Sequence, residues 1–198
     1  MALPESIFSL EGWCTREKAQ ILYDSVISMK PDKVVELGVF AGRSFIPMAL
    51  ALKANGKGDI IGIDPWATTA SLENYDPQDP NHIWWNKLDH GHIYNCFISS
   101  LSNYEVQPFS NHIRGTSKQC VDSFADESID ILHQDGNHSE AISCEEIKIY
   151  AQKIKPGGLW IMDDTDWEST TQAQKLILEY GFTLLEDHKA WIIYKKSV

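Results

Sequence analysis

The sequence predicts an α/β protein with a mostly parallel sheet, and three observations support this fold class. Short runs of Val, Ile and Leu recur along the chain. Stretches with helical periodicity separate them, as repeated βα units require. The last two apolar runs, 182–185 and 191–194, are close enough in sequence to form an antiparallel hairpin at one edge of the sheet. We therefore expect a parallel sheet that is covered by helices on both faces.

The predicted strands are short runs rich in apolar residues, each between turn signals or predicted helices. They are 34–37, 60–63, the region around 112–114, 129–133, 159–162, 182–185 and 191–194. The segment 155–158 (Lys-Pro-Gly-Gly) is expected to be a turn that precedes the fifth strand.

The predicted helices are identified by apolar residues at helical spacing together with start and stop signals. They are a helix capped by Thr15 and closed by Pro31, a helix over 44–54 with Ser44 as its N-cap, a helix around 94–101, helices that start near Ser117 and Ser139, and a helix over 173–180.

The 198 residues, 43% of them hydrophobic, suit a single domain over 1–198. Residues 1–30 form an N-terminal helical segment. Residues 66–90 break the βα pattern because Asp, Asn and Pro are frequent there, yet Trp66, Trp84 and Trp85 lie among them. We interpret this segment as an inserted lid, and Trp84 and Trp85 either stack on a ring of the substrate or anchor the lid or an oligomer interface.

Charge and composition exclude several classes of partner. The net charge of −11 and the pI near 5.0 argue against a nucleic-acid partner, since no basic stripe compensates. No apolar run approaches the length of a membrane span, and the N-terminus has no signal-peptide pattern. The four cysteines show no C-x-x-C spacing, so we expect reduced, buried thiols. These features favour a cytoplasmic protein with a small-molecule substrate and no membrane partner. They leave open whether the protein forms a homo-oligomer.

The segment 33–45 predicts a nucleotide-sized ligand site, because an apolar strand runs into Glu36, Gly38 and Gly42 and then into a helix. Glycines remove side chains where the turn is tight and where a ligand lies against the backbone. A dinucleotide site needs glycine two residues after Gly38, but Phe40 stands there. Glu36 also suits a cationic ligand better than a phosphate.

Acidic residues and glycine close the predicted strands. Because the carboxyl ends of parallel strands share one edge of the sheet, we expect Glu36, Asp64, Gly115, Asp135 and Asp163 to converge there.

The sequence resembles a known family at four motifs: E-L-G-V-F-A-G at 36–42, I-D-P at 63–65, D-G-N-H at 135–138, and K-P-G-G at 155–158 before a strand that ends D-D. Over roughly 33–195 it resembles the class I S-adenosylmethionine (SAM)-dependent methyltransferases, in particular the small-molecule O-methyltransferases of the macrocin and catechol types. The resemblance implies a three-layer, Rossmann-like fold with a seven-stranded sheet whose last inserted strand is antiparallel.

The resemblance also implies which residues bind the cofactor SAM. Glu36, Gly38 and Gly42, with Ser44 at the start of the helix, lie around the methionine part, and Asp64 accepts hydrogen bonds from the ribose. The adenine is flanked by Trp66 and by the turn Gly115, Thr116 and Ser117, and Asp135 lies nearby. The alternative is that Glu36 and Asp64 are only strand-end acids that meet helix N-termini.

Asp135, Asp163 and Asp164 are candidate metal ligands. Three carboxylates at neighbouring strand ends would repel one another without a cation, and Mg²⁺ or another divalent ion accepts such ligands. In the metal-dependent O-methyltransferases an acid after the fourth strand and an acid pair after the fifth hold the ion. The alternative is that these acids are polar rim residues of a metal-free enzyme.

His138 falls where the catechol-type relatives place a lysine that acts as general base. We expect His138, with Asp135, to take part in catalysis; the alternatives are that His138 is a fourth metal ligand or that it hydrogen-bonds at a helix start. His133, inside a strand, is predicted to be a core residue. Asp166, Trp167 and Glu168 follow the acid pair and are candidates for the substrate pocket.

The sequence thus predicts an enzyme that moves a methyl group from SAM to a hydroxyl of a small molecule, such as a sugar diol or a catechol, with the help of a divalent metal. The alternatives are a metal-independent or non-catalytic SAM-binding protein and a nicotinamide-dependent oxidoreductase.

Overall fold

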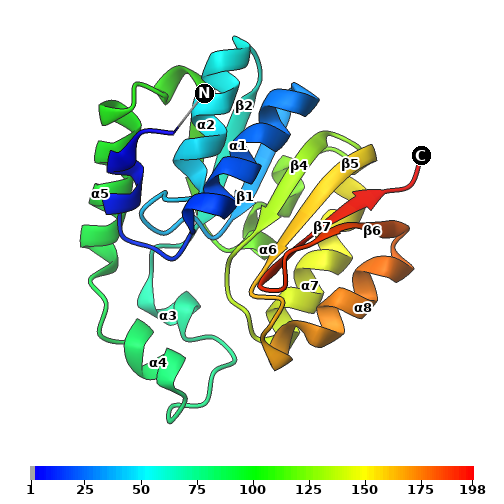
Figure 1. Ribbon diagram of the computed structural model, residues 1–198. Coiled ribbons are helices and arrows are strands. Elements are labelled where there is room, and N and C mark those ends of the chain that lie inside the picture. Colours follow the sequence, from blue (N-terminus) through cyan, green and yellow to red (C-terminus); the bar gives the residue numbers. More distant parts are fainter. Residues whose placement is uncertain (1–2) are drawn as a thin grey trace.

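A computed structural model describes residues 3–198 and shows a seven-stranded sheet between two layers of helices (Figure 1). The strand order is β3-β2-β1-β4-β5-β7-β6. The strands are β1 (Lys33–Leu37), β2 (Asp59–Asp64), β3 (Ser110–Arg114), β4 (Ile129–Gln134), β5 (Ile154–Asp163), β6 (Phe182–Asp187) and β7 (Trp191–Lys196). Strands β1 to β5 are parallel, and β7 is antiparallel to both β5 and β6. The predicted fold class, including the antiparallel C-terminal hairpin, is confirmed.

The helices are α1 (Arg16–Met29), α2 (Phe45–Asn55), α3 (Thr68–Ser71), α4 (Pro80–Trp85), α5 (His90–Asn103), α6 (Ser117–Cys120), α7 (Glu140–Tyr150) and α8 (Thr171–Glu179). Short 3-10 turns cover Glu5–Ser9, Gln107–Phe109, Val121–Ser123, Ala151–Lys153 and Glu168–Thr170. Thr15 caps α1 as predicted, since its hydroxyl accepts a hydrogen bond from the Lys18 N–H at 3.2 Å. Ser44 precedes α2, but the predicted side-chain cap is wrong: its backbone is already helical, and its hydroxyl makes no capping bond.

The core lies on both faces of the sheet because successive side chains of a strand point to opposite sides. Val34 belongs to a cluster with residues of α1, α2 and α5, whereas Val35 belongs to a second cluster with residues of α6, α7 and α8. Helices therefore cover both faces. The central strands β1 and β4 are largely buried as the sequence predicts, whereas the edge strand β6 is exposed after Phe182. All four cysteines are free, and three of them are buried.

Strand β5 is longer than expected. The segment 155–158, which we predict to be a turn, belongs to β5, where it forms an irregularity opposite β4: Ile129 pairs with Ile154, and Ile131 pairs with Leu159. Gly157, within this irregular stretch, adopts φ +76°, a backbone conformation that glycine adopts readily.

The segment 66–90 carries α3 and α4, which lie apart from the two helical layers, below the sheet in the view of Figure 1. It is tied to the end of β4 by the Asn137 side-chain amide, which donates to the Glu73 carbonyl at 2.9 Å. We call residues 66–90 the lid segment, and closure of this segment over a ligand stays a prediction.

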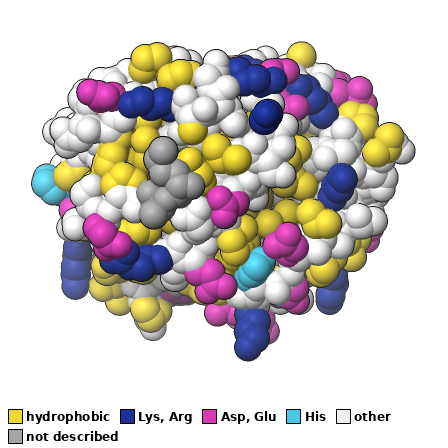
Figure 2. All heavy atoms as spheres, turned by 45° about the horizontal axis from the view of Figure 1, so that its top comes forward, with side chains coloured by type: hydrophobic (Ala, Val, Ile, Leu, Met, Phe, Trp, Pro, Cys, Tyr) yellow, Lys and Arg dark blue, Asp and Glu magenta, His cyan; other side chains and the backbone are white. Residues whose placement is uncertain are grey.

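The surface carries charges of both signs. On the face drawn in Figure 2, Lys and Arg side chains lie singly or in small groups among acidic ones and form no continuous basic area. Within residues 3–198, no helix has the length and apolar composition needed to cross a membrane.

Candidate active site

A cavity of about 640 Å³ lies at the carboxyl ends of the parallel strands. Its wall includes Gly38 after β1, Asp64 of β2, Asp135 after β4 and Asp163 of β5, together with residues of the lid and of the N-terminal segment. Because βαβ connections bring these strand ends to one edge, residues far apart in sequence meet here. The volume is typical of small-molecule and cofactor sites.

The turn after β1 is held by Asp64. One carboxylate oxygen accepts hydrogen bonds from the N–H groups of Val39 at 3.0 Å and Phe40 at 2.9 Å, and the other accepts from the Trp66 N–H at 2.6 Å. Burial raises the pKa of Asp64, while these N–H donors oppose that rise. Asp64 therefore fixes the backbone conformation of the glycine turn that lines the cavity. This structural role is independent of any hydrogen bond that Asp64 makes to a ligand.

Seven of the predicted cofactor residues line the cavity: Gly38, Ser44, Asp64, Trp66, Thr116, Ser117 and Asp135. Glu36, Gly42 and Gly115 do not line it. A β-carbon at Gly42 would lie 2.9 Å from the Phe97 ring, and one at Gly115 would lie 2.9 Å from the Cys120 sulfur. These two glycines make room for side chains of the protein itself.

Trp66 lies largely inside the core. It is 3% exposed, its ring stacks on Phe97 with centroids 5.3 Å apart, and its Nε1 donates to the Phe40 carbonyl at 2.9 Å. Trp66 thus supports the glycine turn from beneath and offers the cavity only a small part of its surface.

Glu36 and His133 form a buried pair on neighbouring strands. Glu36 Oε1 and His133 Nδ1 are 2.8 Å apart, and both side chains are fully buried. Burial raises the pKa of Glu36 and lowers the pKa of His133, so both groups favour their neutral forms. The prediction that His133 is a core residue is confirmed, and Glu36 lies beneath the cavity rather than on its wall.

Asp135 and Asp163 share a cation that the sequence did not lead us to expect, the ammonium group of Lys18 on α1. Lys18 Nζ hydrogen-bonds to Asp163 Oδ2 and lies 3.6 Å from Asp135 Oδ2. Burial acts to raise the pKa of Asp163, but the charge of Lys18, together with His133 and the hydrogen bonds that Asp163 makes, holds that pKa well below its usual range. Burial and the Asp163 charge raise the pKa of Asp135 well above its usual value.

Lys18 had a signal in the sequence. It lies four residues before Leu22 and eight before Val26, so it continues the apolar stripe of α1, and it is 3% exposed. A charged residue on a buried stripe needs a buried partner.

Asp164 pairs with His138. Asp164 Oδ2 lies 3.0 Å from His138 Nε2, and Asp135 Oδ1 lies 3.8 Å from the same nitrogen. Burial acts to lower the pKa of His138, but the hydrogen bond and charge of Asp164 outweigh it and raise that pKa. The Trp167 ring packs edge-on against the imidazole, with centroids 5.5 Å apart. His138 and Trp167 both line the cavity, whereas Asp166 and Glu168 do not.

Four aromatic rings gather at another part of the cavity wall. Trp13 packs on Phe40 and Trp84 with centroid distances of 5.3 and 5.1 Å, and Trp85 lies 4.8 Å from Trp84. The rings come from the N-terminal segment, the glycine turn and the lid. We call Trp13, Phe40, Trp84 and Trp85 the aromatic cluster.

The fold and the cavity define a methyltransferase of the Rossmann-like type. Residues 35–165 match a family described as "Methyltransferase domain". The chain belongs to this family, and the resemblance found in the sequence is confirmed.

The comparison with curated proteins gives a distant relative, the uncharacterized protein y4gI of Sinorhizobium fredii, which is 23% identical over 142 residues. The alignment covers 71% of this chain but only 14% of that much longer protein.

Solved structures show the same fold at low sequence identity. The O-methyltransferase TomG of Streptomyces achromogenes, in complex with SAM, has a TM-score of 0.67 at 12% identity, with 99% of this chain and 91% of that chain covered. The SAH-bound methyltransferase PaMTH1 of Podospora anserina has a TM-score of 0.68 at 10% identity, with 99% and 89% covered. An O-methyltransferase of Bacillus cereus in complex with SAH has a TM-score of 0.66 at 12% identity, with 97% and 86% covered.

Proposed function

We propose that the protein transfers a methyl group from SAM to a hydroxyl of a small molecule. Membership of the methyltransferase family supports the reaction class. The observation that carries the proposal is that the glycine turn after β1 and the residues Asp135 and His138 after β4 line the same cavity. The SAM and SAH complexes of the similar folds favour SAM as the methyl donor.

The cavity wall fits a ligand with a polar nucleoside and a cationic centre. Asp64 uses three of its acceptor positions on backbone N–H groups and keeps capacity for one more hydrogen bond. Thr116 and Ser117 lie at the start of α6, on the wall where the adenine is predicted. Asp135 and Asp163 also line the cavity, and their carboxyl oxygens are suitable neighbours for a positively charged sulfur.

SAM supplies a methyl group on a cationic sulfur, and its transfer in line to an oxygen breaks the sulfur–carbon bond as the oxygen–carbon bond forms. The protein then has two tasks, to align the acceptor and to take the proton that the hydroxyl loses. The His138 imidazole and the Asp135 carboxylate are the groups on the cavity wall suited to receive this proton. Because His138 Nε2 donates to Asp164, the neutral imidazole would accept the proton at Nδ1. Trp167 and Asp164 hold the imidazole in place.

The predicted ligands of Mg²⁺ are Asp135, Asp163 and Asp164, and their arrangement does not fit a site formed by three carboxylates. Asp164 is engaged with His138, and the Lys18 ammonium lies between the other two acids. The proton transfer described above uses no metal.

The aromatic cluster supports an acceptor with a flat or apolar ring, because exposed aromatic faces bind such rings and sugar faces alike. Trp13 is 67% exposed and Trp84 is 42% exposed, so their faces are open to a ligand. Four features remain predictions from the sequence: a small-molecule acceptor, no nucleic-acid partner, no membrane partner and a cytoplasmic location. The oligomeric state remains open.

The test is transfer of radiolabelled methyl from SAM to a panel of catechols, phenols and sugars that bear neighbouring hydroxyls. We expect label in at least one acceptor and formation of SAH, both lost in His138→Ala. SAM binding without transfer to any hydroxylated acceptor would favour the non-catalytic alternative.

A further inference from the structure

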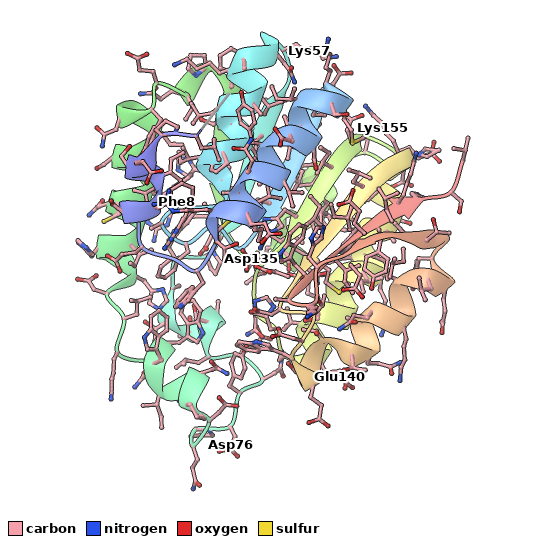
Figure 3. All side chains as sticks on the ribbon, viewed as in Figure 1. Phe8, Lys57, Asp76, Asp135, Glu140 and Lys155 are labelled. Carbon is pink, nitrogen blue, oxygen red and sulfur yellow. The ribbon has the colours of Figure 1, made fainter. Side chains whose placement is uncertain are left out.

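Lys18 is the buried cation of the active-site rim. It lies in the first turn of α1, and its ammonium reaches the ends of β4 and β5. Figure 3 shows Asp135 where the N-terminal end of α1 meets the ends of the strands. Lys18 contacts Asp163 directly and Asp135 at 3.6 Å, and its side chain is 4% exposed. It is not part of the cavity wall, so it lies behind the two acids rather than among the groups that face a ligand.

Basic groups of the chain lie against all three acids of the rim. Lys18 Nζ hydrogen-bonds to Asp163 and lies 3.6 Å from Asp135 Oδ2, and His138 Nε2 lies 3.0 Å from Asp164 Oδ2. The repulsion that would otherwise call for a metal is therefore relieved by groups of the chain itself.

The same residues would form a ligand set if the ammonium were removed. His133, Asp135 and Asp163 each offer one ligand atom within 4.8 Å of the others, and His133 Nε2 is buried with no hydrogen-bond partner among the described residues. With Lys18 in place, a divalent ion bound to these atoms would lie beside the ammonium and be repelled by it.

We propose that the Lys18 ammonium takes the role that the resemblance gives to a divalent metal, so that the rim is built to work without one. Lys18 is a positioning residue: it fixes Asp163 and holds Asp135 against the cavity. Its part in methyl transfer rests on the proposed function, but its exclusion of a metal does not.

The experiment measures Mn²⁺ binding to the full-length protein by electron paramagnetic resonance, with SAM binding followed in parallel by calorimetry. In the wild-type protein we expect no Mn²⁺ site that depends on Asp163, so Asp163→Asn leaves Mn²⁺ binding unchanged. Lys18→Ala opens the ligand set, so its affinity for Mn²⁺ rises at least tenfold, and the double variant Lys18→Ala/Asp163→Asn loses this gain. Lys18→Arg keeps the cation and continues to exclude Mn²⁺.

The matched control is Lys57→Ala, because Lys57 also pairs with an aspartate but lies at the top of the view in Figure 3, well away from Asp135. It leaves Mn²⁺ binding unchanged. A tight wild-type Mn²⁺ site that Asp163→Asn abolishes would overturn the proposal, and this holds even if Lys18→Ala fails to fold. SAM binding separates the proposed function from the proposed role of Lys18. If the wild-type protein binds SAM and also binds Mn²⁺ at Asp163, only the proposal about Lys18 is refuted.

Discussion

The backbone of Gly38 lies directly against the carbonyl group of Asp135. A β-carbon at Gly38 would stand 2.1 Å from the Asp135 oxygen, and the Asp135 N–H donates to the Leu37 carbonyl at 2.8 Å. The turn after β1 and the loop after β4 are therefore locked together, and both sides of the cavity depend on the missing side chain.

Gly38→Ala is expected to abolish the folded state or lower its stability by more than about 3 kcal/mol, because the clash is with backbone and cannot be relieved by a rotamer change. Gly157→Ala is the matched control: φ is +76° there, but nothing lies within 4 Å of the added carbon. It is expected to cost about 1 kcal/mol from backbone strain alone. Thermal unfolding of the two variants compares these values, and equal losses would contradict the role of the Asp135 contact.

Asp164→Asn is expected to lower the pKa of His138 by roughly one unit or more, because the opposite charge 3.0 Å away is removed. Asp164 raises that pKa against the effect of burial, so the imidazole of the variant becomes neutral at a lower pH. Titration of the histidine ring protons by NMR measures the shift. Asp166→Asn, a change at a nearby exposed acid, serves as control, and an unchanged His138 titration in Asp164→Asn would disprove the pairing.

Glu146 predicts a pH-dependent loss of stability. Burial raises its pKa from 4.5 to about 7, so the folded protein holds a proton that the unfolded chain releases between these values. Its contribution is complete below pH 4.5 and is lost as the pH rises through about 7. Over this window the free energy of unfolding falls by an amount on the order of 3 kcal/mol.

Glu146→Gln keeps an acceptor for the Gln134 amide, which donates to Glu146 at 2.8 Å, but it cannot ionise. Its stability relative to wild type should therefore improve steadily from pH 4 to pH 8, as measured by urea unfolding. Glu145→Gln, at the neighbouring and more exposed position, should show no such trend. A constant difference between Glu146→Gln and wild type would contradict the buried, protonated carboxyl.

Trp13→Ala is expected to loosen the lid. Trp13 is 67% exposed, yet its ring packs on Trp84 of α4 and on Phe40 of the glycine turn. Limited proteolysis should therefore cut residues 66–90 several times faster in this variant. Leu184→Ala, a comparably exposed apolar residue on β6, is the control. Equal cleavage rates in the two variants would show that the aromatic cluster does not hold the lid.

The pattern of apolar runs and helical periodicity was sufficient to predict the sheet and the acidic residues at the ends of its strands. The alternation of side chains along β1 explains why Glu36 is buried and does not line the cavity. Glu36 lies on the same face of the sheet as Val34, which packs under α1, α2 and α5. The role of Gly42 depends on the Phe97 ring, which comes from α5 and is not visible in the local motif.

The Lys18 contact could not be predicted in detail, because it joins residues 145 positions apart. The sequence indicates that a lysine interrupts the apolar stripe of α1, but only the packing of α1 over the sheet shows which acids it meets. The sequence predicts that Asp135, Asp163 and Asp164 lie at neighbouring strand ends. It does not predict which of them pair with Lys18 and which with His138, because those contacts depend on the directions of the side chains.

Calorimetric titration of the purified chain with SAM tests the central claim most directly. We expect saturable binding at one site per chain and no comparable binding of NAD. We also expect at least tenfold weaker SAM binding in Asp64→Ala, because the glycine turn loses its anchor. Absence of saturable SAM binding, or equal binding of NAD, would contradict it.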